Sequence, residues 1–196
     1  MHMEEHTLSE MSDELKLMLG RFRYEQFVEK LGWRLPAHPH PGLCEWDQYD
    51  TEQARYVLAI NQRGAIVGCS RLIPSTFPTL LEGVFSQTCS GTPPRDPAVW
   101  EMTRFTTNEP QLAMPLFWRS LRIASQRGAD SIVGVVNRTM ERYYQINGVH
   151  YQRLGAPAVH QNEKIIAIQL SAHREHHRHA LASATFTRSL PLQEIA

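Results

Sequence analysis

The order of strand-forming and helix-forming segments is the feature that most constrains the fold of this chain. Residues 12–31 carry apolar side chains at helical spacing, and two β-rich runs follow at 55–61 and 65–74. The short Gln-Arg-Gly stretch between these runs is typical of a hairpin. Strand and helix patterns then alternate, with strands expected at 99–107, 131–137 and 164–170 and helices at 112–127 and 139–147. This order predicts an α/β fold, a three-layer α-β-α sandwich around a mixed sheet.

Length and charge limit the function classes that are open to the chain. Its 196 residues are expected to form one domain over residues 1–172, followed by a polar, His-rich tail over 173–196 with weak structure signals. Lys and Arg number 20, and Asp and Glu also number 20, so there is no basic excess to hold nucleic acid or an anionic membrane. Neither nucleic acid nor a membrane is therefore expected as a partner.

The N-terminal segment and the cysteines both indicate a cytoplasmic protein. No apolar run approaches the roughly 18 residues that span a bilayer, and the first ten residues are acidic and polar where a signal peptide is basic and then apolar. Cys44, Cys69 and Cys89 form neither a C-x-x-C pair nor an even set, which suits reduced thiols. We expect these cysteines to be small apolar fillers.

Four segments combine charged side chains with aromatic rings, and they are the candidates for a functional site. They read RFRYEQFVEKLGW, EWDQYD, SRLIPS and WEMTRF, beginning at residues 21, 45, 70 and 100. The second segment closes a Pro- and His-rich loop predicted over 34–50, a length that is more often functional than idle. Each charged residue alone is more often solvated or part of a structural ion pair. Together the segments set three arginines against three carboxylates: Arg23, Arg71 and Arg104 against Asp47, Asp50 and Glu101.

Two physical conditions apply if these charges meet in one site. Arg71 lies within a hydrophobic strand pattern, and it needs an acceptor because an unpaired buried charge costs several kcal/mol. Glu101 and Arg104 point to opposite faces of a regular strand, since side chains alternate with a period of two. Both can reach one site only if the strand is bulged between them.

Taken in order, the four segments resemble the acyl-homoserine-lactone synthases, the autoinducer synthases of bacterial quorum sensing. The family pattern is Arg, Phe four residues on and Trp six further, then Glu-x-Asp-x-aromatic-Asp, then Arg-Leu before a Pro, then Glu-x-x-Arg-Phe. The matching residues are Arg23, Phe27, Trp33, Glu45, Asp47, Tyr49, Asp50, Arg71, Leu72, Glu101, Arg104 and Phe105. Each fragment alone is weak evidence for the family. All of the fragments in this order, over positions 20 to 150, are strong evidence for the resemblance.

The resemblance implies an N-acetyltransferase-like fold and two substrates. These are S-adenosylmethionine and an acyl thioester, usually on acyl carrier protein and in some members on coenzyme A. A zwitterionic sulfonium needs carboxylates, an arginine and aromatic faces, and we expect it to be bound by Arg23, Phe27, Trp33 and Phe105. The expected catalytic set is Glu101, as the base, with Arg104, Asp47, Asp50 and Arg71. No metal or redox cofactor is expected, because S-adenosylmethionine is itself a substrate.

The acyl chain requires an apolar slot between the sheet and the helices. We expect Leu121, Val135, Met140 and Tyr144 to line it, although ordinary core packing is the commoner role for such residues. Some family members that take 3-oxo chains carry a hydroxyl residue in the region of Val135 and Val136, so its absence here favours unsubstituted or otherwise modified chains. A carrier protein would dock on a basic patch, for which the candidates are Arg119, Arg122, Arg127, Arg138, Arg142 and Arg153.

Two other functions remain open on the sequence alone. An N-acyltransferase that acts on another amine with acyl-CoA would share the fold, but its Gly-rich pyrophosphate turn has no clean copy here. A non-catalytic sensor of S-adenosylmethionine or of an acyl chain would have no need of Glu101. His173, His176 and His177 have helical metal-ligand spacing, but in a polar tail without cysteines a solvated segment is the commoner outcome.

Overall fold

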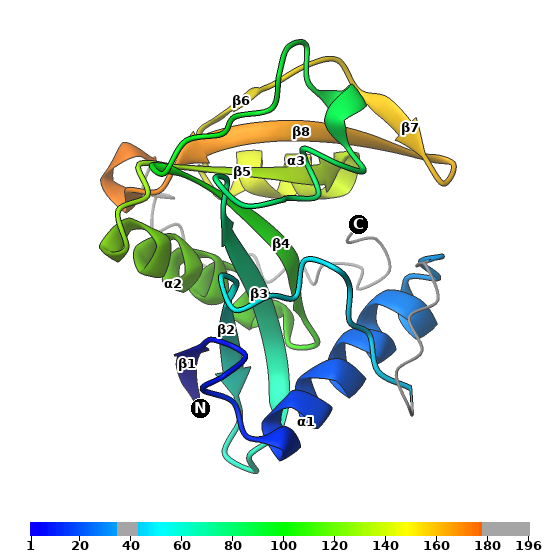
Figure 1. Ribbon diagram of the computed structural model, residues 1–196, viewed down its shortest axis with the longest axis vertical. Helices are drawn as coiled ribbons and strands as arrows, with labels where there is room; N and C mark the ends of the chain where they lie inside the picture. Colours follow the sequence, from blue (N-terminus) through cyan, green and yellow to red (C-terminus); the bar gives the residue numbers. More distant parts are fainter. Residues whose placement is uncertain (35–42, 178–196) are drawn as a thin grey trace.

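A mixed β-sheet forms the centre of the protein. The computed structural model describes residues 1–34 and 43–177, and within them eight strands pair in the order β1-β2-β3-β4-β5-β8-β6, with β7 on β8 (Figure 1). The strands are β1 His2–His6, β2 Arg55–Ile60, β3 Ile66–Pro74, β4 Val99–Thr107, β5 Ser131–Asn137, β6 Tyr151–Arg153, β7 Ala158–His160 and β8 Glu163–Ser171. All neighbours are antiparallel except β4 and β5, which are parallel. The predicted α/β fold with a mixed sheet is confirmed.

Helices cover both faces of the sheet. They are α1 Asp13–Arg23, the π-helix η1 Tyr24–Lys30, α2 Ala113–Gln126 and α3 Arg138–Ile146, with 3-10 turns η2 Ser86–Thr88, η3 Pro110–Leu112 and η4 Arg174–His176. Alternate residues of β2 divide between two cores: Leu58 packs with Leu19 of α1, whereas Val57 packs with Phe117 of α2. This period of two places α1 and α2 on opposite faces of the sheet.

The structure differs from the prediction at the N-terminal end of the chain. The predicted order began with a helix, but β1 precedes it and pairs along β2, from His2 opposite Ile60 to His6 opposite Tyr56. The strand was missed because its sequence, HMEEH, is polar and has no alternating apolar face. The helix predicted over 12–31 is also wound as a π-helix in its second half, and Gly32 follows it with φ +67°.

Residues 74–98 contain five prolines, and the sequence alone predicts a surface excursion there, which is wrong for the middle of the segment between β3 and β4. Leu81 is buried and packs with Val99, Val133 and Ala167 on the face of the sheet that α3 does not cover. The segment is therefore a structural part of the sheet's second face, although its sequence, with four prolines between β3 and β4, shows no apolar periodicity.

The parallel strands β4 and β5 separate along their length, and this positions the cavity described below. They pair only from Val99 opposite Ser131 to Glu101 opposite Val133. Beyond these residues β4 stays with β3 and β5 stays with β8, so the two halves of the sheet diverge, as Figure 1 shows. The divergence begins at Glu101.

The C-terminal tail is described only in part. Residues 173–177 form a turn in which His177 is buried, accepting from the His150 amide and contacting the Ser171 carbonyl oxygen. Residues 178–196 lie outside the described residues, as do positions 35–42 of the predicted loop. Across residues 1–34 and 43–177, no helix has the length and apolar character that a membrane span requires.

Gly155 should be required for seating the segment between β3 and β4. A Cβ at this position would lie 2.5 Å from the Thr88 carbonyl oxygen and 2.8 Å from the Ser90 amide nitrogen. We expect Gly155→Ala to lower the free energy of unfolding by about 1–3 kcal/mol, because backbone must move to admit the methyl group. The matched control is Gly91→Ala, where a Cβ meets nothing within 4 Å. Equal stabilities of the two variants in urea denaturation would contradict this contact.

Candidate active site

Six ionised side chains from four distant segments meet between α1 and the sheet, and we call them the ion cluster. Its members are Arg23, Arg71, Arg104, Glu45, Asp47 and Asp50. Three positive charges face three negative ones, so the cluster is neutral. Every arginine contacts two carboxylates, and every carboxylate contacts two arginines. The sequence set three arginines against three carboxylates, but it named Glu101 where the structure has Glu45.

Arg23 closes the cluster from the helix side. It is the last residue of α1, and its side chain is 1% exposed. Its Nη1 and Nη2 donate to both oxygens of Asp50 at 2.7 and 3.0 Å, and its Nε donates to Glu45. All three nitrogens are thereby used within the protein. Arg23 therefore supports the cluster and presents no unpaired nitrogen to a substrate, which leaves Arg104 as the other predicted arginine that could meet the substrate carboxylate.

Arg71 enters the cluster from β3 and is fully buried. Its Nη1 and Nη2 donate to the two oxygens of Asp47 at 2.6 and 3.0 Å, and Nη1 also donates to Asp50 at 2.7 Å. Its Nε donates to the Thr103 hydroxyl on β4. The acceptor that the hydrophobic strand pattern demanded is therefore the loop that contains Asp47 and Asp50, and Arg71 fixes this loop to the sheet.

Arg104 reaches the cluster through a bulge in β4. Cys69 pairs with Thr106, and Arg71 pairs with Thr103. An advance of two residues along β3 is therefore matched by three residues along β4, which has one extra residue at this point. Arg104 adopts φ +52°, in the left-handed region, which costs a residue with a side chain about 1–2 kcal/mol. The predicted bulge is confirmed. It turns the Arg104 side chain to the face of the sheet that bears the cluster.

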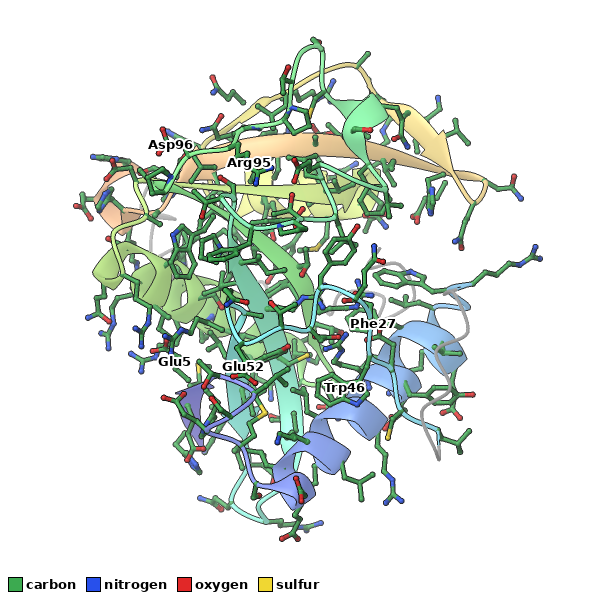
Figure 2. All side chains as sticks on the ribbon, in the orientation of Figure 1. Glu5, Phe27, Trp46, Glu52, Arg95 and Asp96 are labelled. Carbon is green, nitrogen blue, oxygen red and sulfur yellow. The ribbon has the colours of Figure 1, made fainter. Side chains whose placement is uncertain are left out.

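The Arg104 guanidinium bonds carboxylates on one side and contacts aromatic rings on the other. Its Nε and Nη2 donate to Glu45, and Nη2 donates to Asp47 at 2.6 Å, while Nη1 takes no part in these bonds. Its carbon Cζ lies 5.6 Å from the Phe27 ring and 5.4 Å from the Trp33 ring, which stack on each other. Figure 2 shows Phe27 on the side of the helix that faces the sheet.

Burial and ion pairing act in opposite directions on the cluster carboxylates. Burial alone would raise the pKa of Glu45, but Arg23 and Arg104 outweigh it and lower that pKa to about 2. Burial opposes ionisation of Asp50 as well, and Arg23 and Arg71 hold its pKa well below the ordinary range. Both carboxylates therefore stay ionised at neutral pH.

Glu101 is a carboxylate in a different environment. It is 1% exposed and forms no ion pair among the described residues; the backbone amides of Leu80 and Leu81 donate to its two oxygens at 3.0 and 2.7 Å. Burial raises its pKa to about 7, and the two amide bonds only partly offset that rise. Glu101 is thus a carboxylate that changes protonation near neutral pH, as a general base requires. No sequence signal connected it with Leu80 and Leu81.

A cavity of about 660 Å³ runs from the ion cluster into the gap between β4 and β5. At its charged end lie Trp33, Arg34, Glu45, Asp47, Glu101 and Arg104. Its apolar end is lined by Phe105, Phe117, Val133, Val135, Val136, Met140, Tyr144, Ile165 and Ile168. Such a cavity suits a charged substrate and an apolar chain that meet at Glu101.

The cavity sorts the predicted site residues into two groups. Those that line it are Trp33, Asp47, Glu101, Arg104, Phe105, Val135, Met140 and Tyr144. Those that support it from behind are Arg23, Phe27, Asp50 and Arg71. Leu121 does neither, because it is fully buried in the core; Phe117, one helical turn earlier on α2, takes the lining position instead. The sequence also missed Leu80, Val84 and Phe85, which line the cavity from the segment between β3 and β4.

The described part of the chain contains no group of three or more His, Cys, Asp or Glu side chains arranged to hold a metal ion. In particular, His173, His176 and His177 form no such group; His177 instead contacts the protein's own backbone.

Acid should weaken the fold through Glu45. Its pKa is about 2 in the folded protein against an ordinary 4.5, so ionisation stabilises the fold above about pH 4.5 and this contribution is lost as the pH falls toward 2. We expect the free energy of unfolding to drop across this window by about 3 kcal/mol. Urea denaturation at a series of pH values measures the drop.

The matched variants for this titration are Glu45→Gln and Glu82→Gln. Glu45→Gln should destabilise the protein at pH 7 by about 3–5 kcal/mol, because a buried cation loses its partner. It should also make the stability less dependent on pH, because the glutamine side chain does not titrate. Glu82→Gln breaks an exposed pair with Arg95, so it should cost less than about 1 kcal/mol and leave the pH dependence intact. A Glu45→Gln variant that kept the full acid sensitivity would refute the assignment.

Comparisons with known proteins agree with this geometry. Residues 5–180 match the family model described as autoinducer synthase. Over all 196 residues, and over the full length of both proteins, the chain is 74% identical to an acyl-homoserine-lactone synthase of Pseudomonas chlororaphis.

Two solved structures show the likeness of the fold. TofI, crystallised in a ternary complex with an inhibitor and MTA, has a TM-score of 0.79 at 35% identity, covering 88% of this chain and 92% of TofI. An acyl-CoA N-acyltransferase from Pseudomonas aeruginosa has a TM-score of 0.63 at 14% identity, covering 86% of this chain and 98% of that one. The second likeness concerns the fold alone, and it agrees with the predicted N-acetyltransferase-like architecture. The chain belongs to the autoinducer synthase family.

Proposed function

We propose that this chain is an acyl-homoserine-lactone synthase that uses the two ends of its cavity for two substrates. S-adenosylmethionine occupies the charged end, and the acyl chain of a thioester occupies the apolar end. The observation that carries the proposal is the position of Glu101, at the point where β4 and β5 separate and the two ends meet. The products are an acyl-homoserine lactone and methylthioadenosine.

Arg104 and Trp33 are the groups best placed to hold S-adenosylmethionine. The bonds of Arg104 to Glu45 and Asp47 leave its Nη1 for the substrate carboxylate. Trp33 lines the cavity beside it and offers a ring face to the adenine or the sulfonium, an interaction worth about 0.5–2 kcal/mol. Asp47, also at the cavity wall, faces the amine end. Arg23 and Phe27 act from behind, by fixing Glu45 and Trp33.

In the first step the substrate amine attacks the thioester carbonyl carbon. An α-amine has an ordinary pKa near ~8 and is mostly protonated at neutral pH, so a base must remove a proton. Glu101, with a pKa of about 7, takes it directly or through a water. A backbone N–H of the bulged strand stabilises the oxyanion, and collapse of the intermediate forms the amide while the carrier thiol leaves.

In the second step the acylated substrate closes on itself. Its carboxylate oxygen attacks the γ-carbon, forming a C–O bond as the C–S bond to the sulfonium breaks. Methylthioadenosine leaves with the electron pair, so no base is needed and the reaction depends on proximity. Neither step oxidises or reduces a substrate, and the scheme therefore calls for no redox cofactor.

The apolar end of the cavity favours an unsubstituted acyl chain. Val135 and Val136 both line it, so this stretch of β5 offers the chain no side-chain hydroxyl. Tyr144 and Phe117, whose ring centroids lie 4.8 Å apart, form part of the opposite wall on the helices. Neither valine can donate a hydrogen bond to a 3-oxo group.

Acyl carrier protein is the donor that the surface favours. A second hollow, of about 750 Å³, is lined by Arg138, Arg142, Arg153 and Lys164, with Glu141 as its one acidic residue. Carrier proteins are acidic, and a basic hollow on α3 and β8 would attract them by charge complementarity. The other predicted arginines, Arg119, Arg122 and Arg127, lie along α2 and at its end, where Arg127 is paired with Glu5.

The product assay tests the function directly. Purified protein is incubated with S-adenosylmethionine and a panel of acyl-carrier-protein and acyl-CoA donors, and products are identified by mass spectrometry. We expect methylthioadenosine and acyl-homoserine lactone in equal amounts. Acylated product without methylthioadenosine would indicate an N-acyltransferase, and binding of substrate without turnover would indicate a sensor.

Glu101→Gln should separate catalysis from binding. General-base loss costs about 10²–10⁴-fold in rate, so we expect kcat to fall by at least about 100-fold while the Kd for S-adenosylmethionine changes less than about threefold. In the wild type, kcat/KM should rise with pH around pH 7 as Glu101 loses its proton, and the variant should lack this rise. Equal losses of affinity and turnover would show that Glu101 has only a structural role, as the acceptor for the Leu80 and Leu81 amides.

Reversing charge in the basic hollow should affect one donor class selectively. We expect Arg142→Glu to raise the KM for acyl carrier protein by about tenfold or more and to leave the KM for the matching acyl-CoA within about threefold. Arg63→Glu, in the β2–β3 turn, is the matched surface control and should change neither. Equal effects of Arg142→Glu on both donors would contradict docking of the carrier at this hollow.

A further inference from the structure

The peptide of Arg104 is held in an uncommon conformation without a partner in the strand register. Arg104 and Phe105 are the two residues of β4 that are left opposite the gap between Cys69 and Arg71 of β3. Arg104 also has positive φ, which side-chain-bearing residues rarely adopt. The bonds of the Arg104 guanidinium to Glu45 and Asp47 help to hold this conformation from the side chain, and a contact to the peptide itself would add to them.

The thiol of Cys69 contacts this peptide directly. Its Sγ lies 3.3 Å from the Arg104 carbonyl oxygen, and the S–H donates to it. Cys69 is 1% exposed and lies two residues before Arg71, on the same face of β3, directly beneath the ion cluster. Burial raises the pKa of this thiol to about 12, so it keeps its proton, and its capacity to donate, throughout the working pH range.

We infer that Cys69 is a positioning residue for the reaction, and that its thiol holds the bulged Arg104 peptide so that the guanidinium faces S-adenosylmethionine. The inference rests on the proposed function, in which Arg104 meets the substrate carboxylate. It replaces the expectation that Cys69 is only a small apolar filler. Cys44 and Cys89 contact other parts of the protein: the Cys44 Sγ lies 4.0 Å from the Leu17 carbonyl oxygen on the helix, and the Cys89 thiol hydrogen-bonds with the Thr88 side chain.

The geometry explains why a single weak donor would matter. Without the thiol, the Arg104 peptide would be held chiefly through its guanidinium bonds to Glu45 and Asp47, and relaxation from positive φ would shift the guanidinium relative to the cavity. Arg104 is also the arginine of the ion cluster that lines the cavity. Relaxation would thus move a substrate contact while Arg23 and Arg71 kept the rest of the ion cluster in place.

Three substitutions separate donation from packing. Cys69→Val fills the space of the thiol but has no hydrogen-bond donor. Cys69→Ala removes the donor and leaves the space unfilled. Cys69→Ser keeps a donor but buries a hydroxyl group. We expect Val and Ala to raise the KM for S-adenosylmethionine and lower kcat/KM by about tenfold, with the KM for the acyl donor unchanged, and Ser to stay within about threefold of the wild type. Cys89→Ser is the matched control and should leave all constants unchanged.

The order of stabilities should differ from the order of activities. Cys69→Val should be at least as stable as Cys69→Ser in urea denaturation, because the valine side chain, unlike serine, places no hydroxyl group in the core. Cys69→Val would then be the more stable but the less active of the two variants. A role of Cys69 in packing alone would not give this opposite order of stability and activity. If activity follows stability across the three variants, Cys69 is a filler and the inference fails.

A double-mutant cycle tests whether Cys69 acts through Arg104. In an Arg104→Lys background we expect Cys69→Val to change kcat/KM by less than about twofold, because the guanidinium that it positions is gone. Additive losses would overturn the inference. Wild-type protein that forms no lactone would instead refute the proposed function, and the two failures are therefore distinguishable.

Discussion

The structure depends on the mutual neutralisation of three arginines and three carboxylates in a space that water hardly reaches. Removing such charges from water is costly, and only dense pairing with good geometry offsets that cost. Here each carboxylate has two arginine partners, and Asp50 also accepts from the Tyr56 hydroxyl and the Asp47 amide. The end of α1, the loop at 45–50, β3 and β4 are thereby fixed to one another.

This cluster also explains how carboxylates close together can serve different purposes. Glu45 and Asp50 are surrounded by guanidinium groups, so they stay charged and act as supports. Glu101 is held by backbone amides, which are dipoles and not charges, so burial raises its pKa toward neutrality. The three arginines are shared among Glu45, Asp47 and Asp50. Glu101 lies outside the ion cluster and therefore remains free to exchange a proton.

Much of the fold and part of the site could be predicted from the sequence. The strands from β2 to β5 have clear apolar patterns, and the three-residue interval between Glu101 and Arg104 required a bulge that the structure contains. The pairing of charges could not be predicted, because Glu45, Asp47 and Asp50 lie within six residues and sequence spacing does not say which faces inward. Leu121 and Phe117 likewise share one face of α2, and only the divergence of β4 and β5 decides which of them meets the cavity.

Hydrogen exchange at the 45–50 loop tests the central claim, that the ion cluster fixes this loop to the sheet. In the wild type, the amides of Asp47 and Tyr49 bond to carboxylates within the loop. If Arg71 anchors it, Arg71→Met should remove the protection of these two amides far more than that of the Leu58 amide in β2, which reports global unfolding. Equal losses of protection in the loop and in β2 would show that the loop holds its shape without the cluster, and would contradict the account.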